Sequence, residues 1–319
     1  MRIDIVGAGS LGKLFAARLA ASGTEVRLWC RTREQSDTLN RDGLLLYEPG
    51  RPEPVRPENG RLQAYPIEEF AARLSGGSPD WILLAVKQNV LHRDLAEPLS
   101  QLRGNGVRVV CLQNGGGHLA MLRERLPDAR LYAAVTTEGA TGRSLREVTH
   151  AGKGETWIGE YDGGSGADHS EDAIPLQKVL EAAGFTTGLS NEVDTLIYRK
   201  MLVNAVINPL TAIWRVRNGE LLDSEARLDA MRLLCDESVR ILASCGIDAG
   251  NDAWERIVAV CRSTSDNTSS MLADVLAGRE TEVRWINGHL AALAESSGTE
   301  APLNRMATRL VEGMIAKER

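Results

Sequence analysis

A glycine motif close to the amino terminus constrains the fold more than any other feature of the sequence. Gly7-x-Gly9-x-x-Gly12 follows an apolar run at residues 3–6 and opens an amphipathic stretch at 13–22. Between a strand and a helix, the first glycine permits a tight turn, the second lets the backbone approach a pyrophosphate, and the third allows close packing. The alternative is an ordinary glycine-rich turn. We predict a phosphate-binding loop at the start of a helix, made by Gly7, Ala8, Gly9, Ser10, Leu11 and Gly12.

Short apolar runs separated by helical patterns fill the rest of the first half. They lie at residues 24–29, 81–86, 107–112 and 131–135. Nearly continuous apolar runs of this length are typical of strands buried on both faces, as in a parallel sheet covered by helices. We expect the proline-rich region 49–66 to be an irregular excursion or edge strands. Residues 149–159 are expected to form antiparallel strands that close the sheet.

The pattern changes at about residue 191. From there on, helical periodicity is interrupted only at short breaks such as Asn218-Gly219, Cys245-Gly246 and Gly278. We therefore predict an α/β protein with a Rossmann-type, doubly wound parallel sheet in residues 1–190. An all-α domain follows in residues 191–319, and a ligand is expected in the cleft between the two. Residues 163–170 are expected to form a surface loop.

Composition excludes several other classes of protein. The 319 residues include 37 Lys+Arg and 43 Asp+Glu, which gives a net charge of −6, so a nucleic-acid binder is not expected. No apolar run approaches the roughly 18 residues of a membrane span, and no signal peptide is recognised. The cysteines lack metal-binding spacing and the histidines are scattered, so we predict no metal site. A cytoplasmic location is expected.

Residues at the ends of predicted strands indicate which dinucleotide binds. An acidic residue after the second strand would bind the ribose 2′-hydroxyl of NAD, but this chain has Arg31 there, about 20 residues beyond the glycines. A guanidinium suits a 2′-phosphate, so NADP(H) is favoured, with a solvated surface charge as the alternative. Lys87 and Asn114 follow two later strands, at the sheet edge where ligands bind. Helix capping or a surface position for Lys87, and a left-handed turn for Asn114, are the structural alternatives.

A polar stripe stands out in the helical half. Lys200, Asn204 and Asn208 are spaced i, i+4 and i+8, so they share one helix face, while the residues between them are almost entirely apolar. Such a stripe is typical of the lining of a site, and the alternative is a snorkelling lysine with two structural asparagines. Taken alone, Ser270 would most often be a cap or turn residue and Glu282 a solvated charge.

Five segments together resemble the ketopantoate reductase (2-dehydropantoate 2-reductase) family, and the resemblance runs in order along nearly the whole chain. They are Gly-Ala-Gly-Ser-Leu-Gly at 7–12, Val-Asn-Ala-Val-Ile-Asn-Pro-Leu-Thr-Ala-Ile-Trp at 203–214, Asn-Gly-Glu-Leu at 218–221, Ser-Ser-Met-Leu at 269–272 and Thr-Glu-Val-Arg-Trp-Ile-Asn-Gly at 281–288. The resemblance implies NADPH-dependent reduction of 2-dehydropantoate to (R)-pantoate, on the route to pantothenate and coenzyme A.

The resemblance also implies roles for individual residues. The family's catalytic lysine matches Lys200, and its substrate-binding glutamate matches Glu282. The remaining matches are Asn204, Asn208, Ser270 and Asn267 for the substrate, and Gly7, Gly9, Gly12, Arg31, Lys87 and Asn114 for the cofactor. Two residues depart from the pattern. Tyr198 stands where a tryptophan is common, and Glu138 stands where a neutral or basic residue is expected, which leaves open what contacts the nicotinamide there.

Two other functions stay open. A related NADPH-dependent 2-oxo-acid reductase would have the same architecture and a substrate with a different side chain. A non-catalytic NADP-binding sensor would have lost the lysine or the glutamate, and both are present here. The sequence leaves the oligomeric state open, with a homodimer as one alternative.

Overall fold

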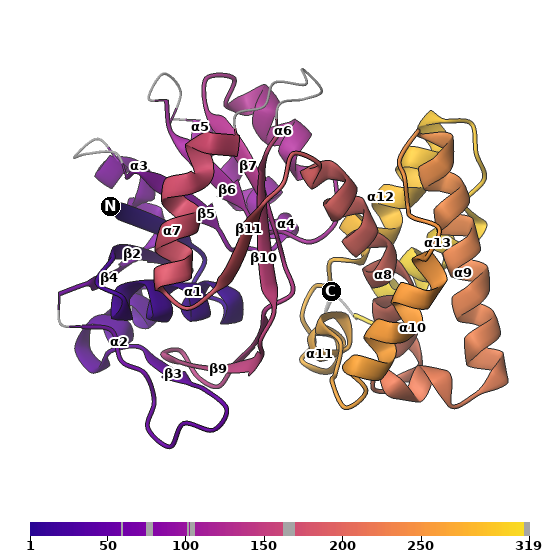
Figure 1. The fold of residues 1–319 in the computed structure, drawn as a ribbon, viewed down its shortest axis with the longest axis horizontal. Helices are drawn as coiled ribbons and strands as arrows, with labels where there is room; N and C mark the ends of the chain where they lie inside the picture. Colours follow the sequence, from indigo (N-terminus) through magenta and orange to yellow (C-terminus); the bar gives the residue numbers. More distant parts are fainter. Residues whose placement is uncertain (59, 75–78, 101, 103–105, 162–169, 316–319) are drawn as a thin grey trace. The chain divides into compact units, whose positions relative to one another are not determined.

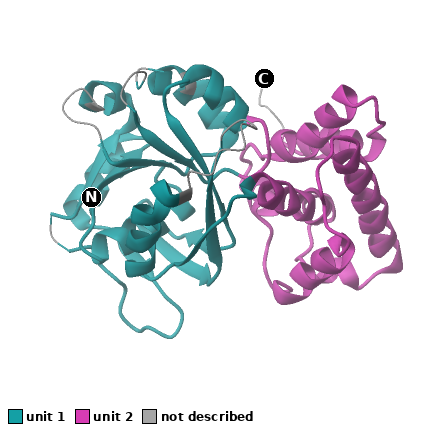
Figure 2. Ribbon diagram, turned by 45° about the horizontal axis from the view of Figure 1, so that its top comes forward, with its two compact units in different colours: residues 1–113, 118–193 teal, residues 114–117, 194–319 magenta. Residues whose placement is uncertain are grey.

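The chain folds into two compact units, shown in Figure 2. The computed structural model describes residues 1–58, 60–74, 79–100, 102, 106–161 and 170–315. Unit 1 comprises residues 1–113 and 118–193, and unit 2 comprises residues 114–117 and 194–319. The sequence placed the change of domain at 190/191 and did not predict that residues 114–117 belong with the helices.

Unit 1 is built on an eight-stranded sheet in the order β11-β10-β7-β6-β5-β1-β2-β4 (Figure 1). Neighbouring strands are parallel, except that β10 is antiparallel to β7. The predicted Rossmann-type parallel sheet is therefore confirmed. The strands are β1 (Arg2–Val6), β2 (Glu25–Cys30), β4 (Leu62–Pro66), β5 (Trp81–Leu84), β6 (Arg108–Cys111), β7 (Arg130–Thr136), β10 (Glu155–Glu160) and β11 (Thr186–Leu189).

Helices cover both faces of this sheet. On one face, α1 packs with α7 through the same buried core as Ile3 and Ile5 of β1, and Phe15 stacks on Phe185 with ring centroids 4.4 Å apart. The helices α4 to α6 lie on the opposite face (Figure 1). The helical elements of the unit are α1 (Ser10–Ala21), α2 (Arg33–Asp42), η1 (Ile67–Glu69), α3 (Phe70–Leu74), α4 (Gln88–Val90), η2 (Leu91–Leu95), α5 (Ala96–Ser100), α6 (His118–Arg125), η3 (Ser170–Ala173) and α7 (Ile174–Ala182).

A second sheet of three strands was not predicted. It has the order β3-β9-β8, with β3 at Leu45–Tyr47, β8 at Gly139–Gly142 and β9 at Glu147–Gly152. We expected residues 149–159 to close the main sheet, but only β10 does so, and β9 belongs to the second sheet. The ammonium of Lys13 on α1 explains the difference, because it donates to the carbonyl oxygens of Ser144 and Glu147 and so holds the β8–β9 hairpin on α1. Of the loop predicted at 163–170, all but the last residue lies outside the described residues.

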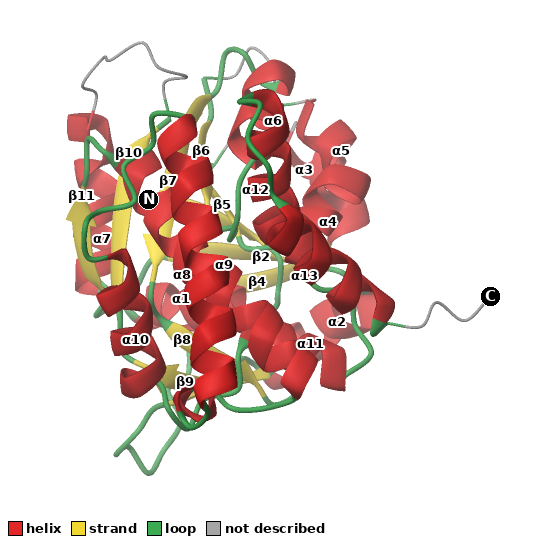
Figure 3. Ribbon diagram, turned by 90° about the vertical axis from the view of Figure 1, so that its right-hand side faces the viewer, coloured by secondary structure: helices red, strands yellow, loops and turns green. Residues whose placement is uncertain are grey.

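Unit 2 is helical, and no strand occurs in its described part (Figure 3). The first and longest helix, α8 (Val193–Trp214), is central to the core, with Met201, Leu202 and Val206 fully buried. None of the helices that the structure describes is long and apolar enough to cross a membrane. The other elements are η4 (Gly219–Leu222), α9 (Glu225–Ser244), α10 (Ala253–Ser263), α11 (Ser270–Leu276), α12 (Val283–Ser296) and α13 (Pro302–Gly313).

Candidate active site

The glycine motif forms the turn from β1 to α1. Gly7 has a φ of 112°, a conformation that L side chains rarely adopt. A Cβ atom on Gly12 would collide with the Gly7 carbonyl oxygen, so only glycine lets the helix begin this close to the strand. By contrast, nothing lies within 4 Å of the position that a Cβ on Gly9 would take. The backbone at Gly9 is therefore open to a ligand.

The amino terminus of α1 suits an anion. Its N-cap residue, Gly9, offers no side-chain cap, and its first turn contains no acidic residue. Amide groups of the first turn, formed by Ser10, Leu11 and Gly12, thus keep their hydrogen-bonding capacity for a phosphate. The Ser10 hydroxyl accepts a hydrogen bond from the Gly142 amide at 2.9 Å and can donate its own hydrogen to a ligand.

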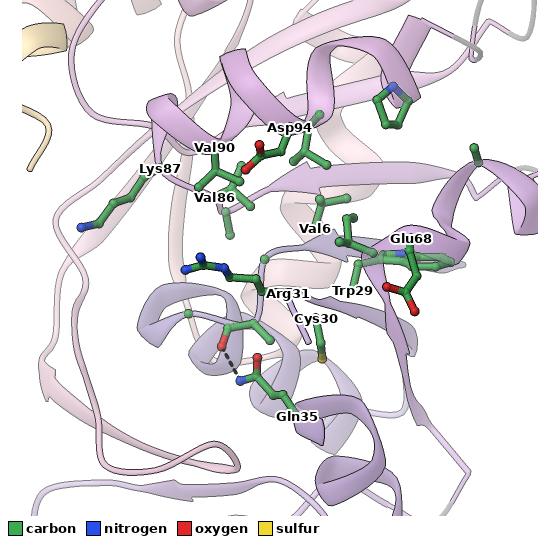
Figure 4. Close-up of a pocket in the computed structure, with 18 residues that line it drawn as sticks. Val6, Trp29, Cys30, Arg31, Gln35, Glu68, Val86, Lys87, Val90 and Asp94 are labelled. Carbon is green, nitrogen blue, oxygen red and sulfur yellow. Dashed lines mark hydrogen bonds between the residues drawn. The ribbon is translucent and has the colours of Figure 1, made fainter. Parts of the chain in front are cut away.

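A cavity of about 440 Å³ opens beside this turn (Figure 4). It is walled by the carboxyl ends of β1, β2 and β5 and by helical segments that follow β2, β4 and β5, at the sheet edge where ligands bind in open α/β sheets. Gly7, Ala8 and Gly9 line it, together with Arg31 and Lys87. Its other lining residues are Val6, Trp29, Cys30, Gln35, Ile67, Glu68, Ala71, Ala85, Val86, Val90, Asp94, Leu95 and Pro98.

The structure distinguishes the two arginines after β2. Arg33 forms ion pairs with Glu68 at 2.8 Å and Glu69 at 2.9 Å, and Thr32 caps α2 by accepting from the Gln35 amide. Arg31 is exposed and forms no ion pair with any described residue. The side chains of Arg31 and Lys87 extend toward the same side of the pocket in Figure 4. Lys87 is the N-cap residue of α4, but its side chain does not cap that helix.

Sequence reasoning missed Gln35. The spacing Thr32-x-x-Gln35 fits a capping box, in which the glutamine side chain would turn back to the N-cap amide. Instead, the side-chain nitrogen Nε2 of Gln35 donates to the backbone carbonyl oxygens of Ala8 at 2.9 Å and Leu145 at 3.0 Å. Gln35 thereby ties the glycine turn to the β8–β9 hairpin, and the capping-box spacing was the signal that could have drawn attention to it.

In unit 2, α8 carries the predicted stripe of Lys200, Asn204 and Asn208. Asn208 is buried, and the other two side chains are half-buried. Glu282 is the N-cap residue of α12, and its carboxylate acts electrostatically on Lys200. Desolvation lowers the pKa of Lys200 from 10.5 to about 8, while the negative charge of Glu282 opposes this shift. The structure therefore brings the lysine close enough to the glutamate for their charges to interact. Lys200 is a cation that can release its proton near neutral pH.

A proline inside α8 explains how α12 is held in register with it. Pro209 has no N–H group, so the carbonyl oxygen four residues earlier, on Ala205, lacks its helical partner. The Asn287 side-chain amide of α12 donates to that oxygen at 2.8 Å and also to Asn304 of α13 at 3.0 Å. Asn287 is fully buried. This hydrogen bond therefore holds α12, which begins next to Glu282, against α8, which carries Lys200.

The segment before α11 is anchored one turn beyond Asn208. Thr211 donates to the Asn208 carbonyl oxygen, and its hydroxyl lies 2.7 Å from that of Ser269, the N-cap residue of α11. The structure thus assigns the capping role to Ser269 and leaves Ser270 exposed at the start of the helix. The side chain of Asn267 is exposed, and its carbonyl oxygen accepts from the Asn218 amide.

The two departures from the family pattern have structural partners. Glu138 is buried in unit 1 and lies 2.5 Å from Nε2 of His150, whose Nδ1 is 3.2 Å from an Arg18 nitrogen. Because a guanidinium can only donate, Nδ1 accepts and Nε2 donates to Glu138, so this carboxylate has a protein partner. Tyr198 of α8 stacks on His289 of α12. Among the described residues, no group of three or more His, Cys, Asp or Glu side chains could hold a metal ion.

Fold and site together define the class: a Rossmann-type unit with an anion-binding glycine turn, joined to a helical unit that carries a lysine–glutamate pair. Two family models match the chain, "Ketopantoate reductase PanE/ApbA" over residues 3–163 and "Ketopantoate reductase PanE/ApbA C terminal" over residues 192–315. The chain belongs to the ketopantoate reductase family and is an oxidoreductase.

Curated relatives match over nearly the whole chain. It is similar to the 2-dehydropantoate 2-reductase of Bacillus subtilis, with 33% identity over 94% of this chain and 93% of the relative. It is also similar to the enzyme of the same name from Archaeoglobus fulgidus, with 30% identity over 98% of this chain and 97% of the relative.

Solved structures agree with this fold. A crystal structure of a probable 2-dehydropantoate 2-reductase from Bacillus subtilis matches with a TM-score of 0.80 and 29% identity, covering 98% of this chain and 100% of that one. A ternary structure of D-mandelate dehydrogenase with NADH and anilino(oxo)acetate matches with a TM-score of 0.86 and 25% identity, covering 98% of both chains. The same architecture thus occurs in enzymes named for different substrates.

Proposed function

We propose that this protein reduces 2-dehydropantoate to (R)-pantoate with NADPH, on the route to pantothenate and coenzyme A. The observation that carries the proposal is the pairing of Lys200 with Glu282 on two helices locked together by Asn287. The choice of substrate is supported by the relatives named 2-dehydropantoate 2-reductase, which match at 30–33% identity over at least 94% of this chain.

The cofactor assignment rests on the fit of unit 1 to a phosphorylated dinucleotide. Gly9 and the first turn of α1 would bind the pyrophosphate, because the backbone at Gly9 is open and the helix terminus has no side-chain cap, while Gly7 makes the turn that leads there. Arg31 would bind the 2′-phosphate of NADPH, since its guanidinium is not engaged in an ion pair with any described residue. We also assign Lys87 and Asn114 to cofactor binding. NADPH supplies the hydride.

Lys200 acts as the general acid in this proposal. Reduction of the substrate's ketone places negative charge on its oxygen, which a neighbouring ammonium stabilises and then protonates. With a pKa of about 8, Lys200 is mostly protonated at neutral pH and still acidic enough to give up its proton. General acid catalysis of this kind contributes about 10²–10⁴-fold in rate.

The other residues bind and orient the substrate. We assign Glu282 to the substrate's hydroxyl group, because a carboxylate accepts a hydrogen bond from a hydroxyl and repels the substrate's own carboxylate. The neutral side chains of Ser270 and Asn267 suit that carboxylate. Asn204 and Asn208, on the lysine's side of α8, orient the substrate and Lys200 without adding charge.

The proposal is tested by mixing the purified protein with NADPH and 2-dehydropantoate and following the absorbance of the reduced cofactor. We expect saturable oxidation of NADPH and formation of (R)-pantoate. Absence of turnover with 2-dehydropantoate, together with turnover of another 2-oxo acid, would exclude the assigned substrate. Faster turnover with NADH than with NADPH would exclude the assigned cofactor.

A second candidate is a reductase of a different 2-oxo acid. The similarity to D-mandelate dehydrogenase favours it, because that enzyme was solved with NADH and with a 2-oxo acid that carries an aromatic group. Comparing kcat/KM for 2-dehydropantoate with kcat/KM for aromatic and branched 2-oxo acids separates the two candidates. The first predicts the highest value for 2-dehydropantoate, and the second predicts it for another member of the series.

A further inference from the structure

The segment 114–117 packs with the helices although both of its neighbouring segments belong to the sheet unit. The Gly116 amide donates to the carbonyl oxygen of Trp285 on α12 at 3.0 Å. Gly115 and Gly117 have φ values of 83° and 89°, so the backbone on either side requires glycine for its conformation. Asn114, which we place at the cofactor, begins this segment.

Gly116 is a glycine for a different reason. Its φ lies outside the left-handed region, so an alanine would be compatible with the backbone. The obstacle is steric. A Cβ atom on Gly116 would overlap Nε2 and Cδ2 of the His289 ring and lie 2.9 Å from its Cε1. The bare backbone of Gly116 therefore forms a tight seat for this ring.

His289 has little freedom to move away. Its ring stacks on Tyr198 of α8, with centroids 6.3 Å apart and an interplanar angle of 20°. Its Nε2 atom is buried and has no hydrogen-bond partner among the described residues, so the ring acts here through its shape. Desolvation also lowers the pKa of His289, which keeps the ring neutral at pH 7.

This contact joins the two helices that carry the lysine and the glutamate of the candidate site. Tyr198 lies two residues before Lys200 on α8, and His289 lies on α12, the helix whose N-cap residue is Glu282. Building on the proposed reductase function, we propose that Gly116 and His289 are positioning residues: their contact fixes segment 114–117 on α8 and α12 and so fixes the position of Asn114, which we assign to NADPH binding.

Gly116→Ala is the direct test. The added methyl group displaces segment 114–117, and a shift of about 1 Å costs up to about 10²-fold in rate. We expect kcat to fall by about that factor. The Kd for NADPH, measured by titrating its fluorescence without substrate, should rise by up to about tenfold, as for the loss of one hydrogen bond. The KM for the 2-oxo acid should stay unchanged, because the groups assigned to it lie elsewhere on α8, α11 and α12.

Relief of the clash provides the decisive comparison. In Gly116→Ala/His289→Ala the ring is gone, so the Kd for NADPH and kcat should return to the values of His289→Ala alone. Gly288→Ala is the matched control next to His289, because its Cβ would meet Arg284 and Thr308 only at ordinary distances of 3.7 and 3.8 Å. We expect it to behave as wild type.

Two results would overturn the inference. One is a Gly116→Ala protein with the wild-type Kd for NADPH, since a loss of folded protein lowers kcat without changing a Kd. The other is a double variant that stays as impaired as Gly116→Ala while His289→Ala alone is less impaired. Should Gly116→Ala not fold, His289→Phe is the alternative test. The phenyl ring is larger than the imidazole ring and would press on Gly116 from the side of α12. It should raise the Kd for NADPH, and an unchanged Kd contradicts the proposal. Lack of turnover by the wild type would count against the reductase function and not against this contact.

Discussion

The two cations to which we assign functions, one in each unit, lie in opposite environments. Arg31 of unit 1 is exposed at the rim of the pocket and has no ion-pair partner among the described residues. Lys200 of unit 2 is half-buried in a largely apolar helix, and desolvation lowers its pKa to about 8 against the opposing charge of Glu282. The Arg31 guanidinium is thus exposed to solvent, whereas the Lys200 ammonium is desolvated and loses its proton more readily.

The difference matches the charges that each cation would meet. A 2′-phosphate is always negative, so a guanidinium that never titrates can recognise it without a special environment. The negative charge on a reduced carbonyl oxygen is transient and has to end as a hydroxyl. A desolvated amine serves this purpose because it stabilises the charge and then gives up a proton. We therefore expect the exposed cation to serve cofactor binding and the desolvated cation to serve proton transfer.

Removing the cation of unit 2 should have the largest effect. We expect Lys200→Ala to lower kcat by at least about 10²-fold, because the general acid is lost, while the protein stays folded. Arg199→Ala is the matched control. Arg199 is the preceding residue on α8 but pairs with Asp248 at 2.7 Å, so its loss should leave kcat nearly unchanged. Steady-state kinetics of both variants make the comparison, and near-normal turnover by Lys200→Ala would remove the lysine from its role.

Removing the cation of unit 1 should change cofactor choice and leave the chemistry intact. Arg31→Ala loses a charge-assisted contact of about 1.5–3 kcal/mol, so we expect its Kd for NADPH to rise by about tenfold or more and its Kd for NADH to change little. Arg33→Ala is the control, since Arg33 is occupied by Glu68 and Glu69. Equal losses for NADPH and NADH in Arg31→Ala would show that this residue does not bind the 2′-phosphate.

A third variant tests the hydrogen bond that holds α12 against α8, the helix of Lys200. Of the three variants, it has the smallest expected effect on activity. Asn287→Ala leaves the Ala205 carbonyl oxygen, freed by Pro209, without its donor. We expect the free energy of unfolding to fall by about 1–3 kcal/mol. Urea denaturation would measure it, with Ser296→Ala on the exposed end of α12 as the control. A wild-type unfolding midpoint for Asn287→Ala would show that this bond does not hold the two helices together.

The fold was predictable where local patterns decide it. The apolar runs at 81–86 and 107–112 became β5 and β6, and the glycine motif became the β1–α1 turn. The three-stranded sheet was not predictable, because β9 is drawn away from the main sheet by Lys13, whose two acceptors lie about 130 residues away in the sequence. Contacts at such separations leave no periodic trace.

The candidate site divides in the same way. Helical spacing alone placed Lys200, Asn204 and Asn208 on one face. It did not reveal that Asn287 donates to the carbonyl oxygen left without a partner by Pro209. Nor did it reveal that Ser269 rather than Ser270 caps α11, or that the Gln35 side chain donates to Ala8 and forms no capping box. Each of these depends on a partner in another element, which the neighbouring sequence does not specify. The segment 114–117 is the clearest case, because its place beside His289 depends on how distant helices pack.

The pH dependence of kcat/KM for ketone reduction tests the central claim most directly. A general acid must be protonated, and the pKa of Lys200 is lowered to about 8, so kcat/KM should be level below that pH and fall tenfold per pH unit above it. Glu282→Gln removes the charge that raises this pKa, so its fall should begin at lower pH. A wild-type profile that stays level to about pH 10, as for an ordinary lysine, would contradict the account.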